Sequence, residues 1–106
     1  MCQNIFASVP QSLPEEQFTA LLSAPGVRIE RIVSTGQATP PGAWFDQDWA
    51  EWVVLLAGEA GLLIEGEATV RVLGPGSTVH LPAHLRHRVE WTSSAPPAVW
   101  LAVHYR

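Results

Sequence analysis

The spacing of hydrophobic residues changes along the chain near residue 26. Between residues 12 and 24 the apolar side chains recur at helical spacing, at Phe18, Leu21 and Leu22. Ser12 and Glu15 stand at the spacing of a helix capping box, and the Pro-Gly pair that follows is typical of a helix end. The pattern therefore predicts one short N-terminal helix over residues 12–24.

From residue 27 onward the pattern has a period of two, which is typical of strands. Residues 27–33 show it first, and glycine and proline turn signals then recur at short intervals. Between those turns lie short runs rich in Val, Leu, Ile and Trp, at residues 52–56, 61–64, 69–73, 78–81, 88–92 and 99–105. Many short strands favour an all-β sandwich or barrel, and the lack of a helical period after residue 26 argues against a βαβ sheet.

Length and composition fit one globular domain over residues 1–106, with 1–26 as a helical extension and 27–105 as the barrel. The hydrophobic fraction is 47% and the charged fraction is 15%. A disordered chain has few hydrophobic and many charged residues, so this composition indicates a globular protein. All six basic residues are arginine, so a Schiff-base or P-loop lysine is excluded. The net charge of -4 lacks the basic field that nucleic acids require, and we expect no nucleic-acid partner.

The chain shows no sign of secretion or of membrane insertion. Cys2 is the single cysteine and cannot form an intramolecular disulfide. The first residues have neither a basic region nor a long apolar run, and no stretch reaches the roughly 18 apolar residues of a membrane span. We therefore expect a cytoplasmic protein without a membrane partner.

Two stretches carry the motifs of greatest interest. In the first, Glu51 is followed after six residues by Gly58. In the second, Gly76 is followed after five residues by Pro82, and His87 stands five positions further on. Turn geometry alone explains part of this pattern, because glycine allows backbone freedom and proline closes a strand.

These stretches resemble the two motifs of the cupin superfamily, G-x5-H-x-H-x3/4-E-x6-G and G-x5-P-x-G-x2-H-x3-N. The resemblance covers roughly residues 27–105 and implies a double-stranded β-helix, or jelly-roll, barrel. In that family, two His and the Glu of the first motif join the His of the second around one divalent metal. The resemblance therefore implies that Glu51 and His87 are metal ligands here.

The first motif departs from the family pattern, because no His precedes position 80. A three-residue gap before Glu51 places Phe45 and Gln47 in the two His positions, whereas a four-residue gap places Trp44 and Asp46 there. We favour Gln47 over Asp46, since the shorter gap keeps it on the face of Glu51 in an unbroken strand. The expected set is then Gln47, Glu51 and His87 around one transition ion: Fe, Mn, Zn or Ni.

His104 is a further candidate ligand, but the sequence leaves its orientation open. Trp100, Ala102 and His104 share one face of the last predicted strand, and the intervening residues share the other. His80 alternates with apolar neighbours and is expected to face outward. His84 occupies the place of the family glycine and is expected to serve a turn.

Charged and aromatic residues near these motifs allow two interpretations each. Asp46, Asp48 and Glu51 are either a solvated acidic rim or carboxylates crowded closely enough for proton transfer. Arg86 and Arg88 flank His87, and alternation places both on the opposite face, which favours surface ion pairs. Five tryptophans are either packing residues or the wall of a ligand pocket. For such a pocket we single out three aromatic residues: Trp44, Phe45 and Trp91.

Two functions remain open at this stage. One is a metal-dependent enzyme acting on a small polar molecule, such as a dioxygenase or an isomerase-like enzyme. The other is a non-catalytic module that binds or senses a small molecule and has lost its metal together with the His pair. In either case we expect a homodimer, with residues 27–33 as an open edge strand that needs a partner.

Overall fold

The computed structural model describes residues 2–106, so Met1, where the predicted domain begins, lies outside the described residues. The described chain forms strands and no helix. The strands are β1 Gln17–Ala24, β2 Val27–Ser34, β3 Ala50–Ala57, β4 Ala60–Ile64, β5 Arg71–Leu73, β6 Thr78–Leu81, β7 His87–Thr92 and β8 Ala98–Tyr105. The all-β prediction is confirmed.

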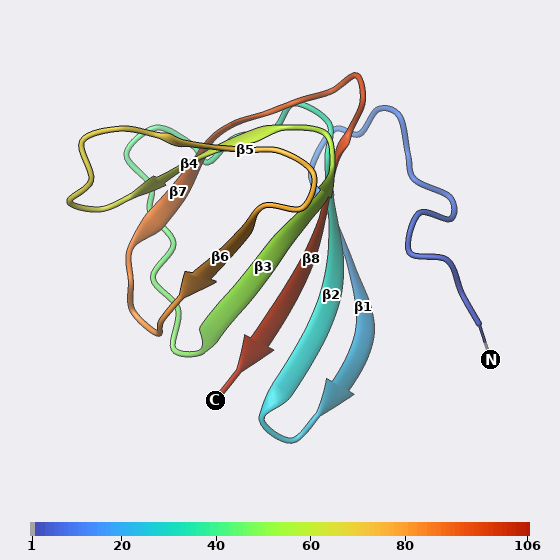
Figure 1. The fold of residues 1–106 in the computed structure, drawn as a ribbon, viewed down its shortest axis with the longest axis horizontal. Helices are drawn as coiled ribbons and strands as arrows, with labels where there is room; N and C mark the ends of the chain where they lie inside the picture. Colours follow the sequence, from blue (N-terminus) through green and yellow to red (C-terminus); the bar gives the residue numbers. More distant parts are fainter. Residues whose placement is uncertain (1) are drawn as a thin grey trace.

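The strands form two antiparallel sheets. The larger sheet has five strands in the order β1-β2-β8-β3-β6, and the smaller has three in the order β5-β4-β7. Figure 1 shows the five strands of the larger sheet fanned side by side, with the smaller sheet toward its β6 end.

The hydrophobic core lies between the sheets, because alternate residues of each strand point inward. On β3, Val53 and Leu55 are buried while the intervening Val54 is only half-buried. The larger cluster takes further residues from the same face of other strands: Ala60, Leu62, Ile64, Leu73, Val79, Leu81, Ala98, Trp100 and Ala102. The alternation predicted from the sequence is therefore present in the strands, and the structure shows which of the two faces enters the core.

The predicted helix over residues 12–24 is wrong. Those residues instead contain β1, which pairs with β2 and places Phe18 opposite Ile32. The register shifts between Ala20 and Leu22, so Leu21 occupies a bulge. A bulge in an exposed strand produces a spacing of apolar residues that imitates a helical stripe, and pairing with β2 outweighs the local helix signals.

The N-terminal residues cover the outer side of this pairing. The guanidinium of Arg31 on β2 donates hydrogen bonds to the carbonyl oxygens of Ile5 and Ala7, at 3.1 and 2.7 Å, and to the Gln17 side chain at 3.1 Å.

The expectation that residues 27–33 form an open edge strand is wrong, since β2 lies between β1 and β8. In residues 2–106 no helix is long and apolar enough to cross a membrane.

Candidate functional site

A cavity of about 90 Å³, here called the inner cavity, lies between the two sheets. Apolar side chains from both sheets form most of its wall, among them Ile32, Val53, Leu62 and Val89. Its polar lining consists of Glu16, Glu30, Gln47, Glu51, His87 and His104. The fold therefore brings six polar residues that lie far apart along most of the chain to one mainly apolar cavity.

Glu51 and His87 both line the inner cavity, although they come from different sheets. Glu51 belongs to the inward face of β3, and His87 is the first residue of β7. Their residue exposures are 7% and 6%, so neither side chain is a solvated edge group. The two residues singled out from the motifs thus share one buried environment.

The Glu51 carboxylate has no hydrogen-bond or ion-pair partner among the residues that the structure describes. Burial raises the pKa of this carboxyl group above its ordinary value of 4.5, because an apolar wall disfavours the charged form. His104 and His87 act in the opposite direction and limit the rise in the pKa of Glu51, whereas Glu30 adds to it. Burial therefore makes Glu51 easier to protonate than a solvated carboxylate.

His87 is fixed by its backbone surroundings. Its Nδ1 lies 2.8 Å from the carbonyl oxygen of Leu85, and since a carbonyl only accepts, Nδ1 carries the hydrogen. In the neutral ring Nε2 then has a free lone pair. The strand bridge between Phe45 and His87 and the stacking of their rings, 5.5 Å between centroids, hold the imidazole in place.

The structure separates Gln47 from Asp46. Phe45 and Gln47 line the inner cavity, as residues two apart on an extended segment should, and Asp46 points away from it. The carboxylate of Asp46 instead lies 2.8 Å from Nδ1 of His84 at the surface. The three-residue spacing before Glu51 therefore matches the arrangement of side chains.

His104 faces inward, which the sequence left open. It is 5% exposed, and its Nε2 donates a 2.9 Å hydrogen bond to Glu30 on the neighbouring strand β2. His104 is also the register partner of Glu51 on β3, so the two side chains lie on the same face of adjacent strands. Because Glu30 already engages Nε2, His104 lines the cavity as half of a His–Glu pair.

Sequence reasoning missed Glu16 and Glu30. Glu30 lies within residues 27–33, where the alternation predicts a strand and no site, and Glu16 lies within the predicted helix over residues 12–24. The hydroxyl of Ser34 donates a hydrogen bond to Glu16, and the Trp100 indole donates one to Ser34 at 3.2 Å. The signal that could have revealed Glu30 is the β2–β8 register, which no local pattern supplies.

Of the three aromatic residues expected to line a pocket, only Phe45 does so. Trp44 lies on the outside, beneath the guanidinium groups of Arg86 and Arg88 at 5.5 and 5.8 Å from its ring centre. Trp91 packs its indole against Gly61, so closely that a Cβ there would be 2.2 Å from the indole nitrogen. Both tryptophans therefore serve packing, and Trp100 is the tryptophan that lines the cavity.

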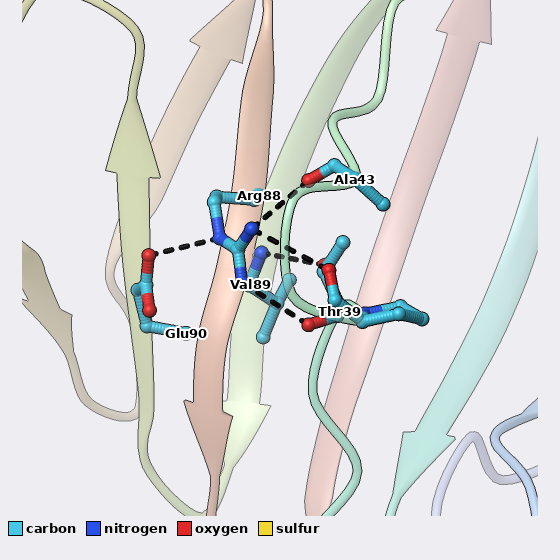
Figure 2. Close-up of polar contacts among 6 residues, drawn as sticks. Thr39, Ala43, Arg88, Val89 and Glu90 are labelled. Carbon is cyan, nitrogen blue, oxygen red and sulfur yellow. Dashed lines mark hydrogen bonds and ion pairs between the residues drawn. The ribbon is translucent and has the colours of Figure 1, made fainter.

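The segment that carries Phe45 and Gln47 is held by Arg88. Figure 2 shows its guanidinium donating hydrogen bonds to the carbonyl oxygens of Ala43 and Thr39, at 3.1 and 3.2 Å, and forming an ion pair with Glu90 at 2.9 Å. The Thr39 hydroxyl accepts a further bond from the backbone of Val89 at 2.9 Å. Arg88 thus holds the backbone of this segment in place.

The remaining predicted residues lie at the surface. His80 is exposed and pairs with the Tyr105 hydroxyl. His84 has a positive φ of 64° and serves a turn. Arg86 forms an ion pair with Glu65 at 2.9 Å. The acidic cluster is divided, since Asp48 is solvated while Glu51 lies inside.

The donor set falls short of the metal centre that the family pattern implies. At the motif positions the cavity has one imidazole (His87), one carboxylate (Glu51) and one amide (Gln47), where the pattern has three imidazoles and one carboxylate, and Phe45 fills one of the His positions. Within residues 2–106 no group of three or more His, Cys, Asp or Glu side chains is placed to hold a metal ion. The set fits at most a loosely held ion, with Gln47 as the third donor.

Comparison with known proteins places these observations in a family. A model of the cupin domain matches residues 31–104. A crystal structure from Ralstonia eutropha JMP134, provisionally assigned as a mannose-6-phosphate isomerase, is 50% identical, with a TM-score of 0.96 over 99% of this chain and 97% of that chain. No curated protein sequence matches this chain.

More distant structures share the fold alone. A protein of unknown function from Streptococcus pyogenes is 17% identical, with a TM-score of 0.77 over 100% of this chain and 87% of that chain. A polyketide cyclase from Streptomyces resistomycificus is 20% identical, with a TM-score of 0.71 over 87% of this chain and 66% of that chain. One scaffold therefore carries proteins of different stated function.

Proposed function

This chain belongs to the cupin domain family, and we propose that it binds a small molecule in the inner cavity, with Glu51 and His87 contacting the polar group of that molecule. The observation that carries the proposal is the unpartnered Glu51 carboxyl group, 7% exposed in a mainly apolar wall. The carboxylate oxygens of Glu51 are open to the cavity and unused by other protein groups, so a ligand there can hydrogen-bond to them.

The shape of the site supports a ligand with a small apolar body. Ligand pockets are mainly apolar with a few convergent polar groups, and the inner cavity has this composition. His87 offers a lone pair at Nε2, and Glu51 offers either an acceptor or, when protonated, a donor. The two side chains can therefore exchange a proton with a bound molecule.

Binding of small fragments tests this proposal. Four-carbon probes with different polar groups are titrated while the Trp100 indole signal is followed by NMR, since this side chain lines the cavity. We expect at least one probe to shift that signal and to bind more weakly to Glu51→Gln. Arg86→Met is the control, because Arg86 pairs with Glu65 at the surface. If no probe shifts the Trp100 signal, the cavity is not a ligand site and the proposal fails.

An isomerase-like enzyme is the second candidate, and two observations favour it. The 50% identical protein carries a provisional isomerase assignment. Isomerisation next to a carbonyl moves a proton, and Glu51, with its raised pKa, together with His87 provides the acid and base for such a step. In a metal-dependent version, Gln47, Glu51 and His87 would instead hold a divalent ion that would supply Lewis-acid polarisation of the carbonyl, and Glu51 and His87 would then not serve as the acid and base.

Measuring metal content distinguishes a metal-dependent isomerase-like enzyme from a protein that works without a metal ion. We expect modest affinity for Zn(II), Mn(II), Fe(II) or Ni(II) in untagged protein, measured by calorimetry and elemental analysis, and loss of it in His87→Ala. His80→Ala is the control, because His80 faces outward and pairs with Tyr105. Metal content that is unchanged in His87→Ala would refute the ligand set, and the ligand-binding proposal would remain to be judged by the fragment experiment.

A further inference from the structure

Acidic side chains outnumber basic ones in the wall of the inner cavity, where His87 and His104 are the basic groups. Glu16, Glu30 and Glu51 contribute carboxyl groups to its wall, and no Arg side chain lines it. The chain has no lysine to supply a positive charge. Arg28 lies in a neighbouring pocket of about 360 Å³, here called the outer pocket, and is 4.0 Å from Glu30. The three carboxyl groups therefore favour a cationic ligand over an anionic one, while His104, His87 and Arg28 partly offset them at Glu51.

The three carboxyl groups differ in how well they are satisfied. Glu16 accepts a hydrogen bond from Ser34, and Glu30 accepts one from His104 at 2.9 Å. Glu51 has no such partner in residues 2–106, although it is more than nine-tenths buried and lines the cavity. An acidic side chain without a partner in an apolar wall is the position that a bound cationic donor would complete.

The apolar wall also suits an organic cation. Phe18, Phe45 and Trp100 line the cavity together with aliphatic side chains. Aromatic faces attract cations electrostatically, and aliphatic surface accommodates the carbon body of an alkylammonium better than it accommodates a hydrated metal ion. The two kinds of wall thus favour a molecule with one charged nitrogen and a short hydrocarbon part.

We propose that the inner cavity selects a small primary ammonium compound, whose nitrogen donates to Glu51 while its carbon body packs against Phe45 and Trp100. This inference rests on the proposed function, since it names the ligand class of the same cavity. A volume of about 90 Å³ has room for the few non-hydrogen atoms of a short alkylammonium compound.

The outer pocket does not provide an anion site that would change this selection. Asp46 and Asp48 line it together with Arg28, and Arg28 already faces Glu30. A phosphate placed there would meet two carboxylates for one guanidinium. The same charges that favour an ammonium group in the inner cavity therefore argue against a phosphorylated ligand spanning both spaces.

A series of probes with one shape and three charges tests the inference. Butylammonium, butanol and butyrate are titrated into the full chain at constant ionic strength, with the Trp100 indole signal and calorimetry as readouts. We expect butylammonium to bind at least about tenfold more tightly than butanol, because hydrogen bonds to charged groups are the stronger ones. Butyrate is expected not to bind.

Two variants identify the residue responsible. In Glu51→Gln the preference for butylammonium over butanol should fall to about twofold or less, with butanol affinity retained, because Gln keeps the shape and loses the charge. Asp48→Asn is the matched control, since the Asp48 side chain is 89% exposed in the outer pocket, and it should retain the full preference.

The outcomes separate this inference from the proposed function. Butanol binding equal to or tighter than that of butylammonium, or a preference that survives in Glu51→Gln, would overturn the ammonium inference and leave the cavity as a ligand site. Absence of any Trp100 shift with all three probes would overturn both. Since the wild-type series alone can refute the inference, the test does not depend on how well the variants fold.

Discussion

At the scale of single residues, Glu51 carries an unfavourable interaction that folding tolerates. Its carboxyl group faces an apolar cavity without a partner in the described chain, and the neighbouring His87 and His104 only partly offset its burial. Residues that break a local rule of packing in this way are expected at functional sites, where a ligand completes them. Stability measurements can therefore detect the site before any ligand is known.

We expect Glu51→Gln to stabilise the protein at neutral pH by about 1 kcal/mol, because it removes a poorly compensated buried charge. Burial raises the folded-state pKa of Glu51 above its ordinary value of 4.5, so the folded state retains the proton longer than the unfolded chain does. The contribution of Glu51 to the stability of the wild-type protein is therefore fully present below the ordinary pKa of 4.5. It is lost as the pH rises through the raised pKa of Glu51 in the folded state.

Urea denaturation of both proteins between about pH 4.5 and pH 8 measures this difference. The gap between Glu51→Gln and wild type should widen as pH rises through that window. Asp48→Asn serves as control, since its carboxylate is solvated and should show no such gap. A gap that narrows with rising pH would mean that Glu51 is stabilised as a carboxylate, contrary to the argument from burial.

The glycines of the two motifs, Gly58 and Gly76, differ in how much space surrounds them. Gly58 and Gly76 both have positive φ, 78° and 91°, but only at Gly58 would a Cβ meet neighbouring backbone, 2.6 Å from the Pro97 carbonyl oxygen. We expect Gly76→Ala to cost about 1–2 kcal/mol through backbone strain alone, and Gly58→Ala to cost clearly more. Thermal unfolding of the pair checks this, and equal losses would contradict the steric explanation.

At the scale of elements, the strands defined by local sequence patterns could be predicted, whereas those that depend on pairing with a distant strand could not. The strands from residue 50 onward could be predicted because alternation and turn residues are local, and Gly58 and Pro82 mark real strand ends. Strand β1 could not, because its apolar residues become a strand only through pairing with β2 and a bulge at Leu21. The motif spacing located Gln47, Glu51 and His87, but Glu30 reaches the cavity through a register that no motif encodes.

The segment that delivers Phe45 and Gln47 to the cavity depends on Arg88. Its side chain is only 13% exposed and donates to several backbone carbonyls, so Arg88→Met should lose about 2 kcal/mol of stability and weaken probe binding. Arg86→Met is the matched control, because Arg86 also covers Trp44 but its surface ion pair contributes at most about 1 kcal/mol. Denaturation and NMR titration would check both, and equal effects would argue against the role given to Arg88.

At the scale of the whole molecule, the larger sheet ends in an exposed strand. Strand β1 forms one edge, and its Phe18, Leu21 and Leu22 are 58%, 45% and 49% exposed. An open edge with apolar side chains tends to pair with another chain unless something covers it. The expected homodimer contact therefore moves from residues 27–33, which are interior, to β1.

We predict that the wild-type chain is a homodimer at tens of micromolar, a concentration of the order at which weak pairs associate, and that Leu22→Arg converts it to a monomer. Leu22 lies on β1 opposite Ile29 and does not line the inner cavity, so the substitution tests the edge without altering the site. Val72→Arg is the control, because Val72 is 67% exposed on β5, an edge of the smaller sheet, and should leave the dimer intact. Sedimentation velocity distinguishes the cases: a monomeric wild type, or a dimer disrupted by Val72→Arg and not by Leu22→Arg, would show that β1 is not the contact.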